Sequence, residues 1–297
     1  SDLLSTKNKH IPCLITIFGA TGDLSHRKLF PSIFHLYQQD NLDEHIAIIG
    51  IGRRDITNDD FRNQVKSSIQ KHVKDTNKID AFMEHVFYHR HDVSNEESYQ
   101  ELLDFSNELD SQFELKGNRL FYLAMAPQFF GVISDYLKSS GLTDTKGFKR
   151  LVIEKPFGSD LKSAEALNNQ IRKSFKEEEI YRIDHYLGKD MVQNIEVLRF
   201  ANAMFEPLWN NKYISNIQVT SSEILGVEDR GGYYESSGAL KDMMQNHMLQ
   251  MVALLAMEAP ISLKSEDIRA EKVKVLKSLR QLKPEEVNQN FVRGQYG

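Results

Sequence analysis

The feature that most constrains the fold is a series of short apolar, β-rich runs separated by charged segments of helical length. The runs are IPCLITIF (11–18), HIAIIGIG (45–52), VFYHRHDV (86–93), RLFYLAMAP (119–127) and KRLVIEKPFG (149–158). Charged segments such as 59–77 and 95–113 lie between them. Near-continuous apolar strands alternating with helices indicate a parallel sheet covered on both faces, with right-handed crossovers. The first half of the chain therefore predicts an α/β fold with a doubly wound parallel dinucleotide-binding sheet.

The second half follows a different pattern after Gly188. Helical periodicity extends over 190–206, 238–257 and 265–282, whereas only 213–225 alternates like a strand. We therefore predict a dinucleotide-binding domain over 1–186 and an α+β domain from 187 to 297. A lone strand has no ladder partner and is not stable by itself. We expect this second domain to be incomplete and the 297-residue fragment to be poorly active.

Composition excludes several classes of protein. A length of 297 residues fits about two domains, and the net charge of −5 argues against a general nucleic-acid or membrane-surface binder. The N-terminal ten residues carry no signal-peptide core, and no apolar run approaches the roughly 20 residues that span a bilayer. The single cysteine, Cys13, cannot form an internal disulfide. We expect a cytoplasmic protein with neither nucleic-acid nor membrane partners.

A glycine turn follows the first predicted strand directly. Glycines at a strand-to-helix turn let the backbone approach a pyrophosphate, and the amides at the helix N-terminus attract its charge. The helix-like segment that follows contains Pro31, which should kink it or divide it into two short helices. An ordinary structural turn is the alternative interpretation. The predicted cofactor-binding residues here are Gly19, Ala20, Thr21, Gly22, Asp23 and Leu24.

The second predicted strand ends in GIGRRDI (50–56). An NAD site usually has an acidic residue at this position for the ribose hydroxyls, whereas arginine suits the 2′-phosphate of NADP. We assign Arg53 to NADP, although Asp55 leaves some NAD use open and a solvated arginine pair is the alternative. Asp92 and Val93 close the third strand, and we expect them near the adenine or its ribose.

Four motifs occur in order along the chain: FGATGDL (18–24), EKPFG (154–158), RIDHYLGK (182–189) and DMMQNHMLQ (242–250). Together they resemble the glucose-6-phosphate dehydrogenase family. EKP by itself also occurs in other nicotinamide-dependent sugar oxidoreductases, whereas the sequence RIDHYLGK is highly specific. The order and spacing of the four motifs match the family along the whole chain, although its members are usually far longer. The absent part would hold most of a large antiparallel sheet, the subunit interface and a further phosphate-binding lysine.

This resemblance implies a specific reaction. The family oxidises the anomeric carbon of D-glucose 6-phosphate to 6-phosphoglucono-lactone and transfers hydride to NADP, the first step of the oxidative pentose phosphate pathway. It also implies a homodimer or higher homo-oligomer. His247 corresponds to the proton acceptor and Asp184 to the carboxylate that orients it. His185 and Lys189 correspond to ligands of the sugar phosphate, with Tyr186 assisting.

The resemblance assigns three more residues to the substrate. Glu223 and Asp242 match positions that bind sugar hydroxyls. Lys155, in EKP, matches a residue between nicotinamide and sugar. Asp242 and His247 are five residues apart, which corresponds to about 140° around an ideal α-helix, so one narrow helical face should not hold both.

Other interpretations remain open at this stage. A histidine flanked by apolar residues, as His247 is, is more often a core residue, and the charged segment 182–189 can form local ion pairs instead of a phosphate site. Another sugar or imine oxidoreductase with an EKP motif is the alternative enzyme. A catalytically silent NADP-sensing module is the alternative of a different class, but it would not need both His247 and Asp184.

Overall fold

The structure is a computed structural model that describes residues 11–42, 44–154, 158–222, 226, 234–235 and 238–294. The chain divides into two compact units, residues 1–183 and 184–297. The boundary predicted after residue 186 lies a few residues further along the chain and stays a prediction.

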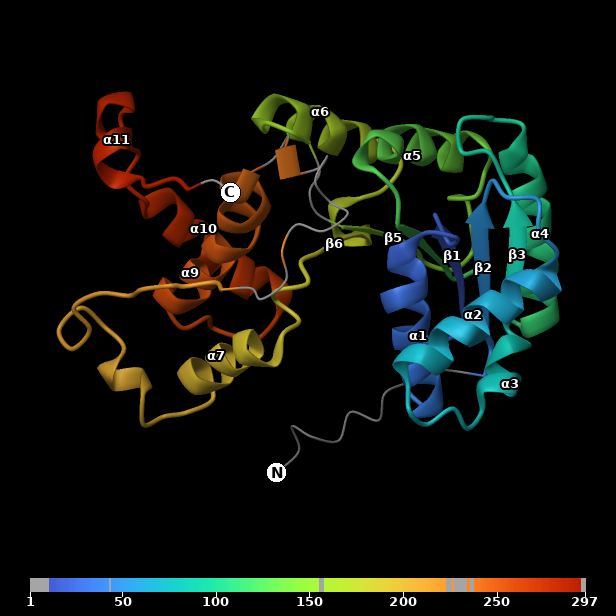
Figure 1. The fold of residues 1–297 in the computed structure, drawn as a ribbon, viewed down its shortest axis with the longest axis horizontal. Helices are drawn as coiled ribbons and strands as arrows, with labels where there is room; N and C mark the ends of the chain where they lie inside the picture. Colours follow the sequence, from blue (N-terminus) through green and yellow to red (C-terminus); the bar gives the residue numbers. More distant parts are fainter. Residues whose placement is uncertain are drawn as a thin grey trace. The chain divides into compact units, whose positions relative to one another are not determined.

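The first unit is built on a six-stranded parallel sheet with the order β3-β2-β1-β4-β5-β6 (Figure 1). Each of the five apolar runs contains one strand, and Ile180–Ile183 adds a sixth at the edge beside β5. Every neighbouring pair is parallel, so the predicted doubly wound sheet is confirmed. The strands are β1 (Cys13–Phe18), β2 (Ile46–Gly52), β3 (Val86–Arg90), β4 (Arg119–Leu123), β5 (Lys149–Glu154) and β6 (Ile180–Ile183).

Helices cover both faces of this sheet and bury two apolar clusters against it. One cluster joins the strands to residues of α1, α2 and α3, among them Phe34, Phe61 and Phe82. The other joins them to residues of α4, α5 and α6, among them Leu109 and Ile133. The helices of this unit are η1 (Ser25–Leu29), α1 (Phe30–Gln38), α2 (Asn58–His72), α3 (Ile79–Met83), α4 (Ser98–Phe113), η2 (Pro127–Phe129), α5 (Phe130–Ser139), α6 (Leu161–Ile171) and η3 (Glu177–Glu179).

Local sequence explains where several of these helices begin. Thr57 caps α2 by accepting a hydrogen bond from the backbone N–H of Asp60 at 3.1 Å. Asp160 and Ser163 form a capping box at the start of α6. Pro31 occupies the first turn of α1, where its missing N–H costs no hydrogen bond, and the π-helix η1 precedes it. Helical backbone runs without a break from η1 into α1 (residues 23–38), so the segment changes its hydrogen-bond pattern just before Pro31 and is not divided into two separate helices.

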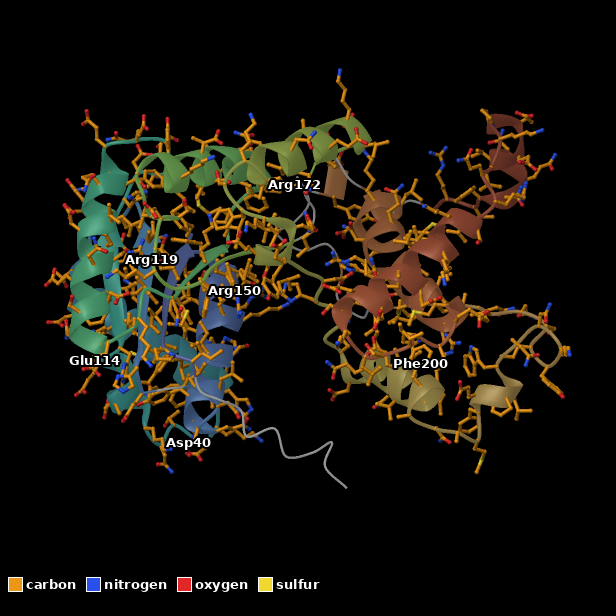
Figure 2. All side chains as sticks on the ribbon, turned by 180° about the vertical axis from the view of Figure 1, so that it is seen from behind. Asp40, Glu114, Arg119, Arg150, Arg172 and Phe200 are labelled. Carbon is orange, nitrogen blue, oxygen red and sulfur yellow. The ribbon has the colours of Figure 1, made fainter. Side chains whose placement is uncertain are left out.

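Arg119, at the start of β4, is buried although it is charged (Figure 2). Its guanidinium donates to the carbonyl of Leu142 at 2.7 Å and to Oδ1 of Asn107 at 2.9 Å. These bonds offset part of the cost of desolvating the cation. Arg119, the first residue of β4, thus links the segment after α5 to α4.

All the regular secondary structure that the structure describes in the second unit is helical. Val192, Met251, Leu254 and Met257 form its buried core. The predicted helices are present but shorter, since 190–206 stops at Phe200 and 265–282 stops at Ser278. The helices are α7 (Asp190–Phe200), η4 (Glu206–Leu208), η6 (Leu240–Met248), α9 (Leu249–Ala256), α10 (Ser265–Ser278), η7 (Pro284–Glu286) and α11 (Val287–Asn290).

The strand predicted over 213–225 is wrong for the residues described, 213–222, which have no regular secondary structure. Alternating side chains favour a strand, but a strand also needs a neighbour for its backbone hydrogen bonds. No ladder partner for this segment occurs among the described residues.

In the described part of the chain, no helix is long and apolar enough to cross a membrane.

We predict that His91 makes the first unit sensitive to acid. His91 directly follows β3 and is buried, with its ring 4.5 Å from that of Tyr99. Burial, and to a lesser extent the neighbouring His89, lowers the pKa of His91 to about 4. Because the unfolded chain binds this proton near the ordinary value of about 6.5, stability should fall as the pH drops from about 6.5 to 4.

His91→Phe removes this difference in proton uptake. It should reduce the pH-dependent loss of unfolding free energy by up to about 3 kcal/mol, because each pKa unit corresponds to about 1.4 kcal/mol. Urea unfolding at a series of pH values measures the effect. Curves of stability against pH that run parallel for the variant and the parent would contradict it.

Candidate functional site

The glycine turn lies where the sequence places it, at the carboxyl end of β1 between β2 and β4. The amides of Gly19 and Ala20 donate to the carbonyl of Ile51 at 3.1 and 2.9 Å. Ser25 Oγ donates to the carbonyl of Gly19 at 2.9 Å. The strand order reverses between β1 and β4, and such a switch point is where open α/β sheets bind ligands.

Gly19 has no room for a side chain. Its φ is +82°, a conformation that L-residues rarely adopt, and an added Cβ would lie 2.2 Å from the carbonyl oxygen of Ala124. Gly22 and Asp23 are exposed, whereas Ala20 is buried. Asp23 forms an exposed ion pair of 3.0 Å with Arg27. The crowding at Gly19 and the exposed backbone beyond it fit the close approach of a pyrophosphate.

The carboxyl ends of β2 and β3 adjoin this turn. An added Cβ at Gly52 would lie 2.9 Å from Cγ2 of Thr21, so the turn packs against the end of β2. Arg53 follows, is exposed, and makes no hydrogen bond or ion pair within the described chain. Asp92 is exposed at the end of β3, where its Oδ1 accepts from the N–H of Ser94, whereas Val93 is buried.

These features favour a dinucleotide at this edge of the sheet. The glycine turn suits a diphosphate, and Arg53 adds an exposed cation at the end of β2. Sequence reasoning missed Tyr122 on β4, whose hydroxyl donates to Glu154, the first residue of EKPFG. Burial, and then the bond to Glu154, raises the pKa of Tyr122 well above its ordinary value, so the hydroxyl stays protonated.

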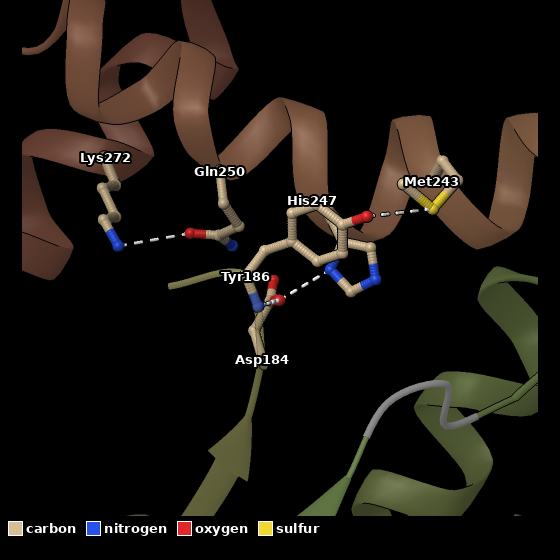
Figure 3. Close-up of polar contacts among 6 residues, drawn as sticks. All are labelled: Asp184, Tyr186, Met243, His247, Gln250 and Lys272. Atoms are coloured by element: carbon tan, nitrogen blue, oxygen red, sulfur yellow. Dashed lines mark hydrogen bonds and ion pairs between the residues drawn. The ribbon is translucent and has the colours of Figure 1, made fainter. Parts of the chain in front are cut away.

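A second site lies wholly within the second unit and centres on His247. Nδ1 of His247 is 2.6 Å from Oδ1 of Asp184 (Figure 3). The Asp184 side chain is 1% exposed and that of His247 is 14% exposed. A carboxylate only accepts hydrogen bonds, so this contact requires a proton on Nδ1, and in the neutral imidazole Nε2 is then the nitrogen that carries the lone pair. The predicted pair is thus in contact.

Asp184 is oriented by the turn that it begins. Its Oδ1 also accepts from the backbone N–H of Tyr186 at 3.0 Å, and its carbonyl accepts from the N–H of Leu187 at 3.1 Å. An aspartate that bonds to the backbone two residues on stabilises such turns. The turn Asp184–Leu187 therefore fixes the position of the carboxylate that contacts His247.

His247 belongs to η6, a π-helix rather than an α-helix. The N–H of Leu249 donates to the carbonyl of Met244, which is the i to i+5 pattern of this geometry. Residues five apart are therefore neighbours on successive turns, so Asp242 and His247 share one side of the helix. The expectation of about 140° between them was wrong, because it assumed α-helical geometry. Asp242 is buried at 7% exposure.

The remaining residues of RIDHYLGK surround this pair. The Tyr186 ring stacks on His247 with centroids 4.2 Å apart and planes 18° apart. Nζ of Lys189 lies 3.8 Å from the Tyr186 centroid. His185 and Lys189 are exposed, and Lys189 directly precedes α7, whose N-terminal amides favour anions. Arg182 instead bonds Glu177 at 2.7 Å and Asn168 at 2.5 Å.

Three observations complete the comparison with the sequence predictions. Lys155 and Glu223 lie outside the described residues. Met243 was missed, although its Sδ accepts from the Tyr186 hydroxyl at 3.8 Å (Figure 3). Nothing in a methionine-rich helix signals such a contact, since methionine at this spacing is typical of a core.

Comparisons with known proteins agree along the whole chain. The family described as "Glucose-6-phosphate dehydrogenase, NAD binding domain" matches residues 16–194, and "Glucose-6-phosphate dehydrogenase, C-terminal domain" matches residues 196–297. The chain is similar to the glucose-6-phosphate 1-dehydrogenases of Bacillus subtilis (61% identity) and Leuconostoc mesenteroides (48% identity). Each comparison covers 97% of this chain but 59% of the relative.

Two solved structures are also similar. One is described as "Glucose-6-phosphate dehydrogenase in complex with its substrate glucose-6-phosphate", with a TM-score of 0.84 and 41% identity over 91% of this chain and 56% of that one. The other is glucose-6-phosphate 1-dehydrogenase from Mycobacterium avium, with a TM-score of 0.79 and 35% identity over 93% of this chain and 59% of that one.

We predict that Gly19→Ala weakens dinucleotide binding by at least tenfold, because the new Cβ must displace the Ala124 carbonyl or the turn itself. Isothermal titration with the oxidised dinucleotide measures this change. Gly141→Ala is the matched control: Gly141 has a similar φ of +86°, but its Cβ would meet only Cδ2 of Leu103 at 3.9 Å. Equal affinities for the two variants would show that crowding at the turn is unimportant.

Proposed function

Because the chain belongs to the glucose-6-phosphate dehydrogenase family, we propose that the whole protein oxidises D-glucose 6-phosphate at its anomeric carbon. The product is 6-phosphoglucono-lactone, and NADP is the hydride acceptor. This is the first step of the oxidative pentose phosphate pathway. The observation that carries the proposal is the 2.6 Å contact between Asp184 and His247.

His247 is the general base of this proposal. The anomeric hydroxyl must lose its proton as the carbon loses hydride, so a base must lie within hydrogen-bond reach of that hydroxyl. Nε2 is available because Asp184 holds the proton on Nδ1. As the imidazole takes up the second proton, the Asp184 carboxylate stabilises the imidazolium, as the carboxylate of a catalytic triad does.

The substrate phosphate is assigned to His185 and Lys189, with Tyr186 beside them. Both are exposed on the segment that leads into α7, and a cation at a helix N-terminus suits a dianion. Binding energy from this remote group positions the reacting carbon at the base. Asp242, on the same side of η6 as His247, is assigned to a sugar hydroxyl. Glu223 and Lys155 keep the roles that the family implies.

The cofactor is assigned to the edge of the sheet at β1, β2 and β3. When bound, it supplies the hydride acceptor. The turn Gly19–Leu24 would hold its diphosphate, Arg53 the 2′-phosphate, and Asp92 with Val93 the adenosine end. The choice of NADP over NAD rests on the exposed guanidinium of Arg53, which has no ion-pair partner among the residues that the structure describes, while Asp55 leaves some NAD use open.

Three further features belong to the proposal for the whole protein. They are the large antiparallel sheet of its second domain, a homodimer or higher homo-oligomer, and a cytoplasmic location. The chain spans just under three fifths of the length of the relatives compared above. A sensor without chemistry would need neither the base nor its carboxylate, so the paired side chains favour the enzyme.

We predict that His247→Asn lowers kcat by several powers of ten, because asparagine cannot take up the proton. The dissociation constant for glucose 6-phosphate should change little. Absorbance of NADPH measures kcat, and calorimetry measures sugar binding. Adding Asp184→Asn should cost much less than the product of the two single losses, because the pair acts as a unit.

His35→Asn, at an exposed histidine of α1, is the matched control and should leave kcat unchanged. Near-normal kcat in His247→Asn, or a loss explained entirely by weaker sugar binding, would make His247 a core or binding residue.

We predict that Arg53→Ala weakens NADP binding about ten- to hundredfold, because it removes a charge-assisted contact worth roughly 1.5–3 kcal/mol. NAD, which lacks the 2′-phosphate, should bind almost unchanged. Titration of both cofactors separates the effects, with Arg172→Ala, an exposed arginine just after α6, as the control. Equal losses for the two cofactors would refute the assignment.

A further inference from the structure

Tyr186 makes two side-chain contacts with one helix. Its ring stacks on the imidazole of His247 at 4.2 Å, and its hydroxyl donates to Sδ of Met243 at 3.8 Å (Figure 3). Met243 and His247 are four residues apart on the π-helix η6. The phenol therefore spans about one turn of the helix that carries the base.

The contact with Asp184 alone does not fix the plane of the His247 ring. One hydrogen bond restrains the distance from Nδ1 to Oδ1 but tolerates a range of angles, so small coupled rotations about χ1 and χ2 of His247 can tilt the ring without breaking it. Such rotation moves Nε2, the atom that must reach the substrate. A second ring that stacks nearly parallel, at 18°, opposes the rotation.

Met243 in turn holds the phenol. The hydroxyl hydrogen bond to sulfur is weak, but it joins the far end of the Tyr186 ring to the same helix as His247. The near end is held by the backbone N–H of Tyr186, which donates to Asp184 Oδ1 at 3.0 Å. Both ends of the tyrosine are thus tied to groups that also fix the histidine.

We propose that Tyr186 is a positioning residue for His247, that its ring rather than its hydroxyl is the essential part, and that Met243 sets the tilt of this ring. The proposal rests on the assignment of His247 as the base. It differs from a role as a phosphate ligand, which needs the hydroxyl and not the stacked ring. Lys189, with Nζ 3.8 Å from the ring centroid, connects the phosphate segment to the same ring.

Three variants separate the ring from the hydroxyl. Tyr186→Phe keeps the ring and removes the hydroxyl, Tyr186→Leu removes the ring, and Met243→Leu removes the sulfur acceptor. Met244→Leu is the matched control, because it makes the same change at the next residue of η6, which is exposed. Each variant of the whole protein is assayed with glucose 6-phosphate and with free glucose, which has no phosphate to bind.

Tyr186→Leu should lower kcat about 10- to 100-fold for both sugars, because a shift of about 1 Å in a catalytic group costs on that order. Tyr186→Phe should keep kcat within about threefold for both, and Met243→Leu should lower it about two- to fivefold. Met244→Leu should match the parent. A rise in KM for glucose 6-phosphate alone in Tyr186→Leu, or an equal kcat loss in the Phe and Leu variants, overturns the proposal.

A readout without turnover separates this inference from the proposed function. The ring protons of His247 should show an upfield ring-current shift in the NMR spectrum, which Tyr186→Phe keeps and Tyr186→Leu abolishes. If the parent oxidises neither sugar, the proposed function fails, and an unchanged shift in Tyr186→Leu would also reject the stacking role. If Tyr186→Leu does not fold, Met243→Leu decides: a His247 spectrum and kcat identical to those of Met244→Leu reject the proposal.

Discussion

One carboxylate oxygen organises the second unit. Oδ1 of Asp184 accepts from the backbone of Tyr186 and from Nδ1 of His247. The first bond shapes the turn of RIDHYLGK, and the second places a proton on Nδ1 of His247. An ionised carboxylate buried at 1% exposure is costly unless such donors satisfy it. The segment that carries the proposed phosphate ligands and the helix that carries the proposed base therefore depend on the same atom.

The π-helical geometry of η6 has a comparable consequence for the substrate side. A helix with i to i+5 bonds sacrifices favourable packing along its axis, and such segments recur at functional sites. Here residues five apart lie on successive turns, which suits the proposed placement of Asp242 near His247. In an α-helix these two residues would be about 140° apart. Tyr186 contacts both Met243 and His247, which are four residues apart on η6.

The sheet could be predicted from sequence because its information is local. Near-continuous apolar runs such as HIAIIGIG require burial on both faces, and glycine, proline and capping residues mark the ends of elements. The pairing of Asp184 with His247 could be predicted only through the family resemblance, because 63 residues separate them. The π-helix and the stacked Tyr186 depend on tertiary contacts that no periodicity records. The strand over 213–225 failed for the same reason: its alternation is local, but its hydrogen-bond partners are not.

The glycine turn and the residues around His247 depend on different parts of the fold. The glycine turn, Arg53 and Asp92 all lie at the carboxyl edge of the sheet, so the cofactor site depends on strand order and on the fit at Gly19. Asp184, Tyr186 and His247 belong to the second unit, where a small core of Val192, Met251, Leu254 and Met257 holds them. A large sheet core tolerates loosening elsewhere better than a four-residue core does. Destabilisation outside the sheet should therefore disturb Asp184, Tyr186 and His247 before it disturbs the glycine turn.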